Sequence, residues 1–81
     1  MEPIKISVIY GHDWEAIYAG LDLVVDGHHV SSRELVEAMK KYDTLHVVFY
    51  DMSVKGYEWL EELGSFPMSI DLIPQYYLIE S

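Results

Sequence analysis

The stretch SSRELVEAMKKYDTLHVVFY, residues 31–50, decides the fold because it combines a capped helix with a strand that follows it directly. Ser31 and Glu34 have the spacing of a capping box, in which each side chain binds the other residue's free backbone amide. Apolar residues then recur at helical spacing up to Tyr42, beside lysines that suit the negative end of the helix dipole. We therefore predict a helix over residues 32–42.

The elements downstream of this helix are a strand and a second helix. Residues 44–50 are apolar on both faces and rich in β-branched side chains, which is typical of a central strand covered on both sides. A helix over residues 54–63 follows, with Asp51 or Ser53 as its N-cap. Gly64 is well placed to end it in the left-handed conformation that glycine adopts without strain.

Three short apolar runs separated by turn residues predict an antiparallel meander before the first helix. Residues 4–10 alternate apolar and polar side chains, which is the period of a half-buried strand. Strands over residues 15–19 and 23–30 follow, the second interrupted by an Asp-Gly pair that supplies a tight turn or a bulge. At the other end of the chain, residues 75–79 either complete the sheet or form an interface.

The order β-β-β-α-β-α-β predicts an α+β domain that spans residues 1–81. In this arrangement a mixed sheet of four to five strands and two helices packed on it form a two-layer sandwich. The strand-helix-strand unit in the middle makes the strand after the first helix parallel to the strand before it.

The amino-acid composition excludes several classes of function for this domain. The chain has 81 residues, 14 acidic side chains against 5 basic ones, a net charge of -9 and no cysteine. Phosphate backbones are bound through lysine and arginine, so we expect no direct contact with nucleic acid. The lack of cysteine excludes disulfides and thiolate chemistry. No apolar run reaches the ~18 residues that a membrane span needs and no secretory leader opens the chain, so we expect a cytoplasmic protein without a membrane partner.

The negative charge is concentrated in the second half of the chain. Residues 42–81 carry seven acidic side chains and one basic side chain. Three of the acids, Glu58, Glu61 and Glu62, share a face of the second predicted helix. An exposed acidic face is either a solvated surface or a docking site for a basic partner.

Aromatic side chains favour the docking site. Seven tyrosines and two tryptophans exceed what a small core readily hides, and both residue types are preferred interface anchors. The ones that the predicted faces leave least clearly inside are Trp14, Tyr18, Trp59, Tyr76 and Tyr77. We therefore predict a non-enzymatic protein-binding module whose partner has a basic surface. The alternatives are that these aromatics fill the core or form a homodimer seam.

A second hypothesis places an anionic ligand at the strand-to-helix junction over residues 27–33. Helix amides and Arg33 point outward there, and His28 and His29 lie just ahead of them. An oligomeric protein that binds an anionic metabolite or nucleotide would use this junction. The competing explanation is that the capping box already occupies these amides.

Catalysis and metal binding have weaker support in the sequence. A metal-dependent enzyme would use His12, Asp13 and His28, which are residue types that zinc accepts, but no recognisable metal-binding spacing is present. The neighbours His28 and His29 point to opposite faces of a strand. No phosphate-binding glycine loop or nucleophile elbow occurs. We therefore predict no enzymatic activity, no metal and no cofactor.

Two motifs carry a resemblance to small uncharacterised phage-borne and bacterial proteins. DWEAIY, residues 13–18, and GHHVSSREL, residues 27–35, are similar to a W-E-x-x-Y strand followed by a G-H-x-[VI]-S strand-to-helix junction. The resemblance spans residues 12–50, and His28 matches the histidine of the pattern. It implies a phage origin, where small acidic proteins often inhibit host enzymes or defence systems. The expected function is then inhibition of a host defence protein or of a nucleic-acid-handling protein.

Overall fold

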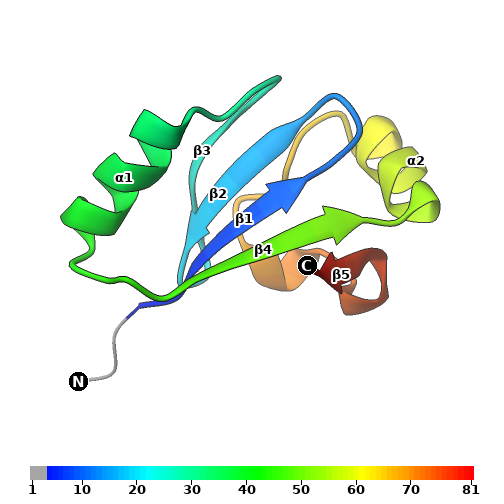
Figure 1. Cartoon of the computed structure of the whole chain (residues 1–81). Coiled ribbons are helices and arrows are strands. Elements are labelled where there is room, and N and C mark those ends of the chain that lie inside the picture. The colour runs from blue at the N-terminus through cyan, green and yellow to red at the C-terminus, as the bar shows by residue number, and fades with distance from the viewer. Residues whose placement is uncertain (1–3) are drawn as a thin grey trace.

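The described chain, residues 4–81 of a computed structural model, folds around one mixed five-stranded sheet (Figure 1). The strands are β1 (Ile6–Tyr10), β2 (Glu15–Ala19), β3 (Asp22–Gly27), β4 (Val47–Met52) and β5 (Leu78–Glu80). The helices are α1 (Ser32–Lys41) and α2 (Val54–Leu63), and two 3₁₀ turns, η1 (Ile70–Leu72) and η2 (Gln75–Tyr77), precede β5. The predicted α+β class with a mixed sheet and two helices is confirmed.

The strand order β3-β2-β1-β4-β5 places the first strand in the centre of the sheet. The antiparallel meander of β1, β2 and β3 is confirmed, and β4 adds beside β1 in parallel. Ile6, Ser7 and Ile9 are each 0% exposed, so the prediction of a half-buried first strand is wrong. The predicted central strand, β4, does lie between two strands, β1 and β5, but Phe49 is exposed, so it is not covered fully on both faces. The first strand is buried because β4 joins the meander beside β1 and not beside β3.

A bulge interrupts the pairing of β2 with β3, though not where the Asp-Gly pair predicts it. Ile17 pairs with Val25 and Tyr18 pairs with Leu23, so the extra residue is Val24. Gly27 pairs with Glu15 and stays in β3 as an ordinary strand residue. The bulge therefore precedes the Asp-Gly pair.

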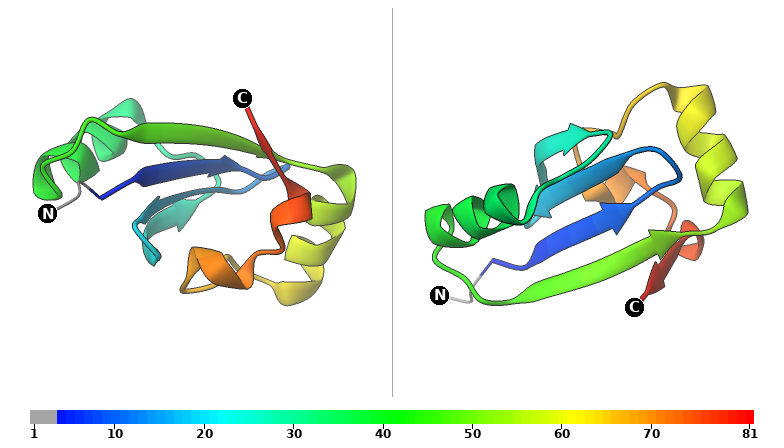
Figure 2. Two further views of the ribbon diagram at one scale, coloured as in Figure 1. Left: turned by 90° about the horizontal axis from the view of Figure 1, so that it is seen from below. Right: turned by 45° about the horizontal axis from the view of Figure 1, so that its top comes forward.

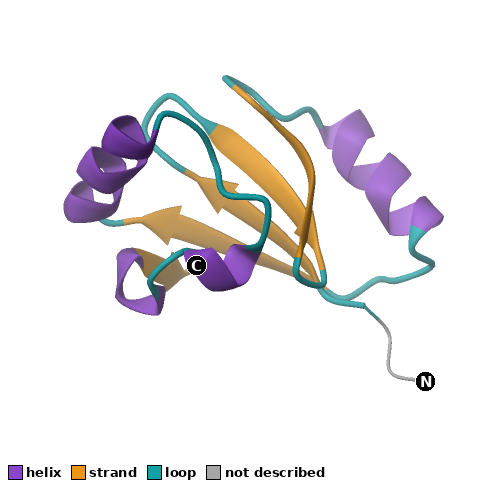
Figure 3. Ribbon diagram, turned by 180° about the vertical axis from the view of Figure 1, so that it is seen from behind, coloured by secondary structure: helices purple, strands orange, loops and turns teal. Residues whose placement is uncertain are grey.

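Apolar side chains cover both faces of the sheet. Figure 2 shows α1 and the C-terminal segment on opposite sides of the strands. On one face Ile6 and Val8 pack with Ala38 of α1. On the other face Ile9 packs with Leu60 of α2 and with Ile73 in the C-terminal segment. Figure 3 shows this segment crossing the sheet on the side away from α1. The sheet is thus a middle layer, which adds one layer to the arrangement expected from the sequence.

Both helices have the caps that the sequence predicts. In α1 the Glu34 amide donates to Ser31 Oγ (3.2 Å), and the Ser31 amide donates to Glu34 Oε1 (3.1 Å), which completes the capping box. In α2 the Gly56 amide donates to Ser53 Oγ (3.1 Å). Gly64 ends this helix with φ of 88° and donates its amide to the carbonyl of Leu60, as its left-handed conformation allows.

The end of the C-terminal segment completes the sheet through β5, whereas residues 75–77 of the predicted strand form the 3₁₀ turn η2. Leu78 pairs with Met52 and Glu80 pairs with Tyr50, both antiparallel. The Ser53 amide also donates to the carbonyl of Tyr77 (2.9 Å), so η2 is fastened to the start of α2. Among residues 4–81, neither α-helix has the length and apolar character needed to cross a membrane.

Candidate functional site

Exposed carboxylates on α2 lie beside a group of aromatic rings from the C-terminal segment. Glu58 and Glu62 are exposed, and so is Tyr76, whose side chain is 78% accessible. The Tyr76 ring meets the Tyr77 ring edge-on at 4.7 Å between centroids, and Tyr77 in turn lies 5.8 Å from Trp59. Tyr76, Tyr77 and Trp59 are therefore neighbours, with Tyr76 exposed and the other two half-buried against the core.

The charge of α2 acts directly on these rings. The pKa of the Tyr77 hydroxyl is raised above its usual range, first by burial and then by the neighbouring Tyr76. Glu62 and Glu58 raise it further, because a negative charge nearby opposes formation of a tyrosinate. Glu58 and Glu62 therefore lie near the Tyr77 hydroxyl.

Trp14 and Glu61 form a second group of side chains near α2. Both line a cavity of about 190 Å³ together with Tyr57. His12 also lines it, with its ring 5.5 Å from that of Tyr57. We call the whole set the acidic–aromatic surface, and its members are Trp14, Glu58, Trp59, Glu61, Glu62, Tyr76 and Tyr77.

Tyr18 does not belong to this surface, which corrects its place among the predicted partner-binding residues. Its side chain is 0% exposed, because β2 lies inside the sheet and this ring faces the C-terminal layer. The hydroxyl donates to the carbonyl of Pro67 (2.7 Å), and the ring meets Phe66 edge-on at 6.5 Å. Burial and the charge of Asp26 both raise the pKa of Tyr18. Tyr18 is therefore a core residue.

The amino end of α1 is already occupied by carboxylates of the chain itself. Glu15 Oε1 accepts the amide of Val30 (2.8 Å), and Glu34 Oε1 accepts the amide of Ser31 (3.1 Å). The sequence predicts the capping box at this position but not the contribution of Glu15. Glu15 pairs with Gly27 across β2 and β3 and therefore lies next to the junction. An anionic ligand at this helix end would meet two carboxylates.

The histidines and the arginine predicted for that ligand already have partners within the chain. His29 Nδ1 lies 3.4 Å from Glu15 Oε1, and Arg33 Nε lies 3.4 Å from Glu37 Oε1 on the next turn of α1. His28 Nδ1 lies 3.1 Å from the carbonyl oxygen of Asp13 and lines the same cavity as Trp14. The junction over residues 27–33 does not gather these groups around a common space.

The histidines considered for a metal site do come together in the fold. His12, Asp13 and His28 line the same small cavity, although His12 and Asp13 both reach outward into solvent. In residues 4–81, however, no three metal-binding side chains approach one another closely enough to hold an ion. The shared cavity therefore gives no geometric support to metal chemistry.

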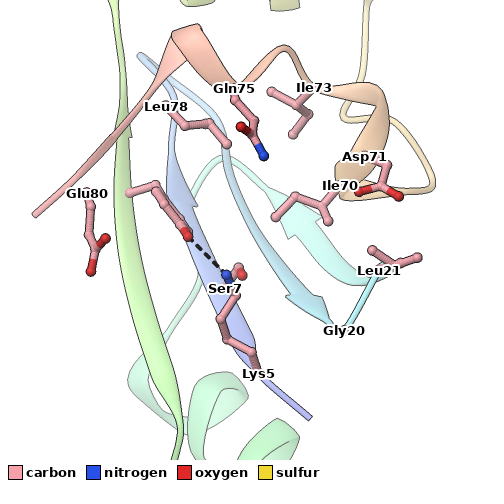
Figure 4. A pocket seen from close by; sticks show the side chains of 11 residues that line it. Lys5, Ser7, Gly20, Leu21, Ile70, Asp71, Ile73, Gln75, Leu78 and Glu80 are labelled. Carbon is pink, nitrogen blue, oxygen red and sulfur yellow. Dashed lines mark hydrogen bonds between the residues drawn. The ribbon is translucent and has the colours of Figure 1, made fainter.

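A larger cavity, of about 610 Å³, lies between the sheet and the C-terminal segment (Figure 4). Its polar lining includes Lys5, Ser7, Tyr50 and Gln75. Lys5 and Ser7 are not among the predicted site residues, because the polar positions of residues 4–10 indicate the solvent side of a half-buried strand. Ile9, which shares that side with Ser7, was the one sign that it is covered.

Gly56 sets how closely η2 packs against α2. A Cβ at this position would meet Tyr77 Cβ at 3.0 Å and Met52 Cε at 3.1 Å. We expect Gly56→Ala to lower the free energy of unfolding by about 1 kcal/mol, because overpacking costs about 1–3 kcal/mol and exceeds the ~1 kcal/mol of helix propensity gained. Urea unfolding measures this, with Lys55→Ala as the exposed control. A more stable Gly56→Ala variant would contradict the close contact.

Comparison with protein-family models, with curated proteins and with solved structures finds no match to this chain. The family resemblance of residues 12–50 therefore stays a prediction. Support for a proposed function therefore comes from the geometry of the described residues alone.

Proposed function

We propose that this chain is a non-enzymatic protein-binding module whose acidic–aromatic surface docks a partner with a basic surface. The observation that carries the proposal is the exposed Tyr76 ring against Tyr77, whose hydroxyl lies near Glu58 and Glu62 of α2. Tyrosine and tryptophan give large contact areas and lose little conformational entropy on binding. They are enriched among the residues that dominate binding energy. Carboxylates around them attract a basic partner and speed its association.

The kind of partner follows from the charge of the chain. With a net charge of -9, this protein is repelled by nucleic acid and attracted to proteins that bind nucleic acid, because those carry the opposite charge. The resemblance to phage-borne proteins makes a host defence protein or a nucleic-acid-handling protein the proposed target. Binding would block the basic groove that the target uses for its own ligand.

Charge reversal on α2 tests the proposal. A basic protein captured from the source cell is purified, and its affinity is measured by calorimetry at two salt concentrations. We expect Glu58→Lys with Glu62→Lys to weaken binding by about tenfold or more, which is about 1.4 kcal/mol. We also expect affinity of the unchanged chain to fall as salt rises, because salt screens the attraction.

The matched control is Asp22→Lys with Glu37→Lys, which changes the net charge equally at two exposed sites away from α2, in β3 and α1. An equal loss of affinity in both double variants would show attraction to net charge and no defined site. Unchanged affinity after reversal on α2 would make the acidic face a solvated surface. A mass that rises with concentration, lost on Tyr76→Ala, would assign the tyrosines to a homodimer seam instead.

A further inference from the structure

The cavity of about 610 Å³ is built over a buried polar group that the fold leaves unpaired. Ser7 lies in the middle of the central strand and is 0% exposed. Within residues 4–81 its hydroxyl has no hydrogen-bond partner. Buried polar atoms are satisfied in the great majority of native structures, so an unpaired hydroxyl that lines a cavity indicates a place for a ligand atom.

A cation lies next to this hydroxyl. Lys5 precedes Ser7 by two residues in an extended segment, so both side chains leave the same face of the sheet. Its ammonium donates to the Tyr50 hydroxyl (3.1 Å) and lies 5.5 Å from the centroid of that ring. An ammonium has three N–H donors, and this bond uses one of them.

The remaining walls are mostly apolar. Ile70, Ile73 and Leu78 come from the C-terminal segment that crosses this face (Figure 4). Gln75 reaches from the same segment toward the Lys5 side of the cavity (Figure 4). A space of this size, largely apolar with a few convergent polar groups, has the properties of small-molecule sites in general.

We propose that this cavity binds a small organic monocarboxylate. The carboxylate accepts hydrogen bonds from the Lys5 ammonium and the Ser7 hydroxyl, and the apolar body of the ligand packs against Ile70, Ile73 and Leu78. Hydrogen bonds between a charged donor and a carboxylate are about twice as strong as those between neutral groups. This site goes beyond the proposed protein-binding function, since none of these residues belongs to the acidic–aromatic surface.

The charges around the cavity restrict the ligand to a single negative charge. Asp71 and Glu80 also line it, at its margins (Figure 4). With one cation inside and two carboxylates at the margins, a second negative charge on the ligand would be repelled. Dicarboxylates, phosphate and nucleotides are therefore excluded by the same residues that line the site.

Thermal unfolding and calorimetry with defined probes test this proposal. The probes are 4-methylpentanoate and phenylacetate, their neutral carboxamides, succinate and inorganic phosphate. We expect the two monocarboxylates to raise the melting temperature and the other probes to leave it unchanged. An equal rise with acid and carboxamide would show apolar filling only and would overturn the carboxylate assignment. No binding of either monocarboxylate at millimolar concentration would overturn the site itself.

Two variants locate the bound carboxylate. We expect Lys5→Met and Ser7→Ala each to weaken binding of phenylacetate by about tenfold or more, with Lys55→Met and Ser65→Ala as exposed controls. Ser7→Ala also separates a ligand-binding role from a structural one. Because its hydroxyl has no partner in the described part of the chain, the free variant is expected to be at least as stable as the unchanged chain. A Ser7→Ala variant that is less stable and binds normally would overturn the proposal.

Discussion

Replacing Leu60 with alanine is expected to lower the free energy of unfolding by about 2–5 kcal/mol, the usual range for a buried leucine. Leu60 is 2% exposed and is the α2 side chain that enters the core cluster of Ile9, Met52 and Ile73. The variant loses the transfer free energy of the deleted carbons and leaves a cavity that the sheet cannot close. A domain of this length has roughly 4–12 kcal/mol of stability in total, so this single change removes a large share of it.

The loss extends to the proposed binding surface, because α2 carries the carboxylates and Leu60 anchors α2. Urea unfolding followed by tryptophan fluorescence measures the change, since Trp59 lies on the same helix. The control is Leu63→Ala, the same substitution three residues on, where the side chain is 50% exposed. Equal losses from the two variants would show that Leu60 does not dock the helix.

Alkaline pH is expected to unfold the protein through Tyr18. The ordinary pKa of tyrosine is 10.0, and both burial and Asp26 raise the pKa of Tyr18 in the folded chain. Below pH 10 the hydroxyl is neutral in both states and its stabilising contribution is complete. Above pH 10 the unfolded chain loses this proton and the folded chain keeps it, so stability falls by about 1.4 kcal/mol for each pH unit.

Tyr18→Phe isolates this effect. At neutral pH the variant should be less stable by about 1 kcal/mol, because the hydrogen bond to the Pro67 carbonyl is lost. It should lack the Tyr18 share of the alkaline loss, so the two stability curves cross roughly one unit above pH 10. Urea unfolding at several pH values measures both curves, and Tyr76→Phe is the exposed control. Parallel curves for the unchanged chain and Tyr18→Phe would assign the alkaline loss to other groups.

The helices could be predicted from the sequence because their signals are local. The capping box of Ser31 and Glu34 and the cap at Gly64 each need only a few neighbouring residues. The centre of the sheet could not be predicted, because it depends on which side of the meander β4 joins. That choice exposes Phe49 and buries Ser7, and no local pattern encodes it.

The candidate surface shows the same division. Helical spacing alone groups Glu58 with Glu62, and this held in the structure. Their proximity to Tyr77 depends on the hydrogen bond that fastens η2 to the start of α2, which is a tertiary contact. The prediction for Tyr18 was wrong because a tertiary contact is absent from the sequence pattern. In a sheet expected to be covered on one face, a tyrosine without an identified packing partner is predicted to be exposed.

The parallel pairing of β1 with β4 also sets the order in which the sheet assembles. Ile6 pairs with Val47 across about half of the chain, whereas β1, β2 and β3 are joined by short turns. Closing short loops costs less entropy than closing a long one, so we expect the meander to form before β4 pairs with β1. Until β4 pairs, the backbone hydrogen-bonding groups along one edge of β1 have no partner. A bare edge between apolar faces is a template for pairing with another chain. We therefore expect the yield of refolding to fall as protein concentration rises. Dilution reduces the pairing of β1 with another chain before β4 has formed its own pairing.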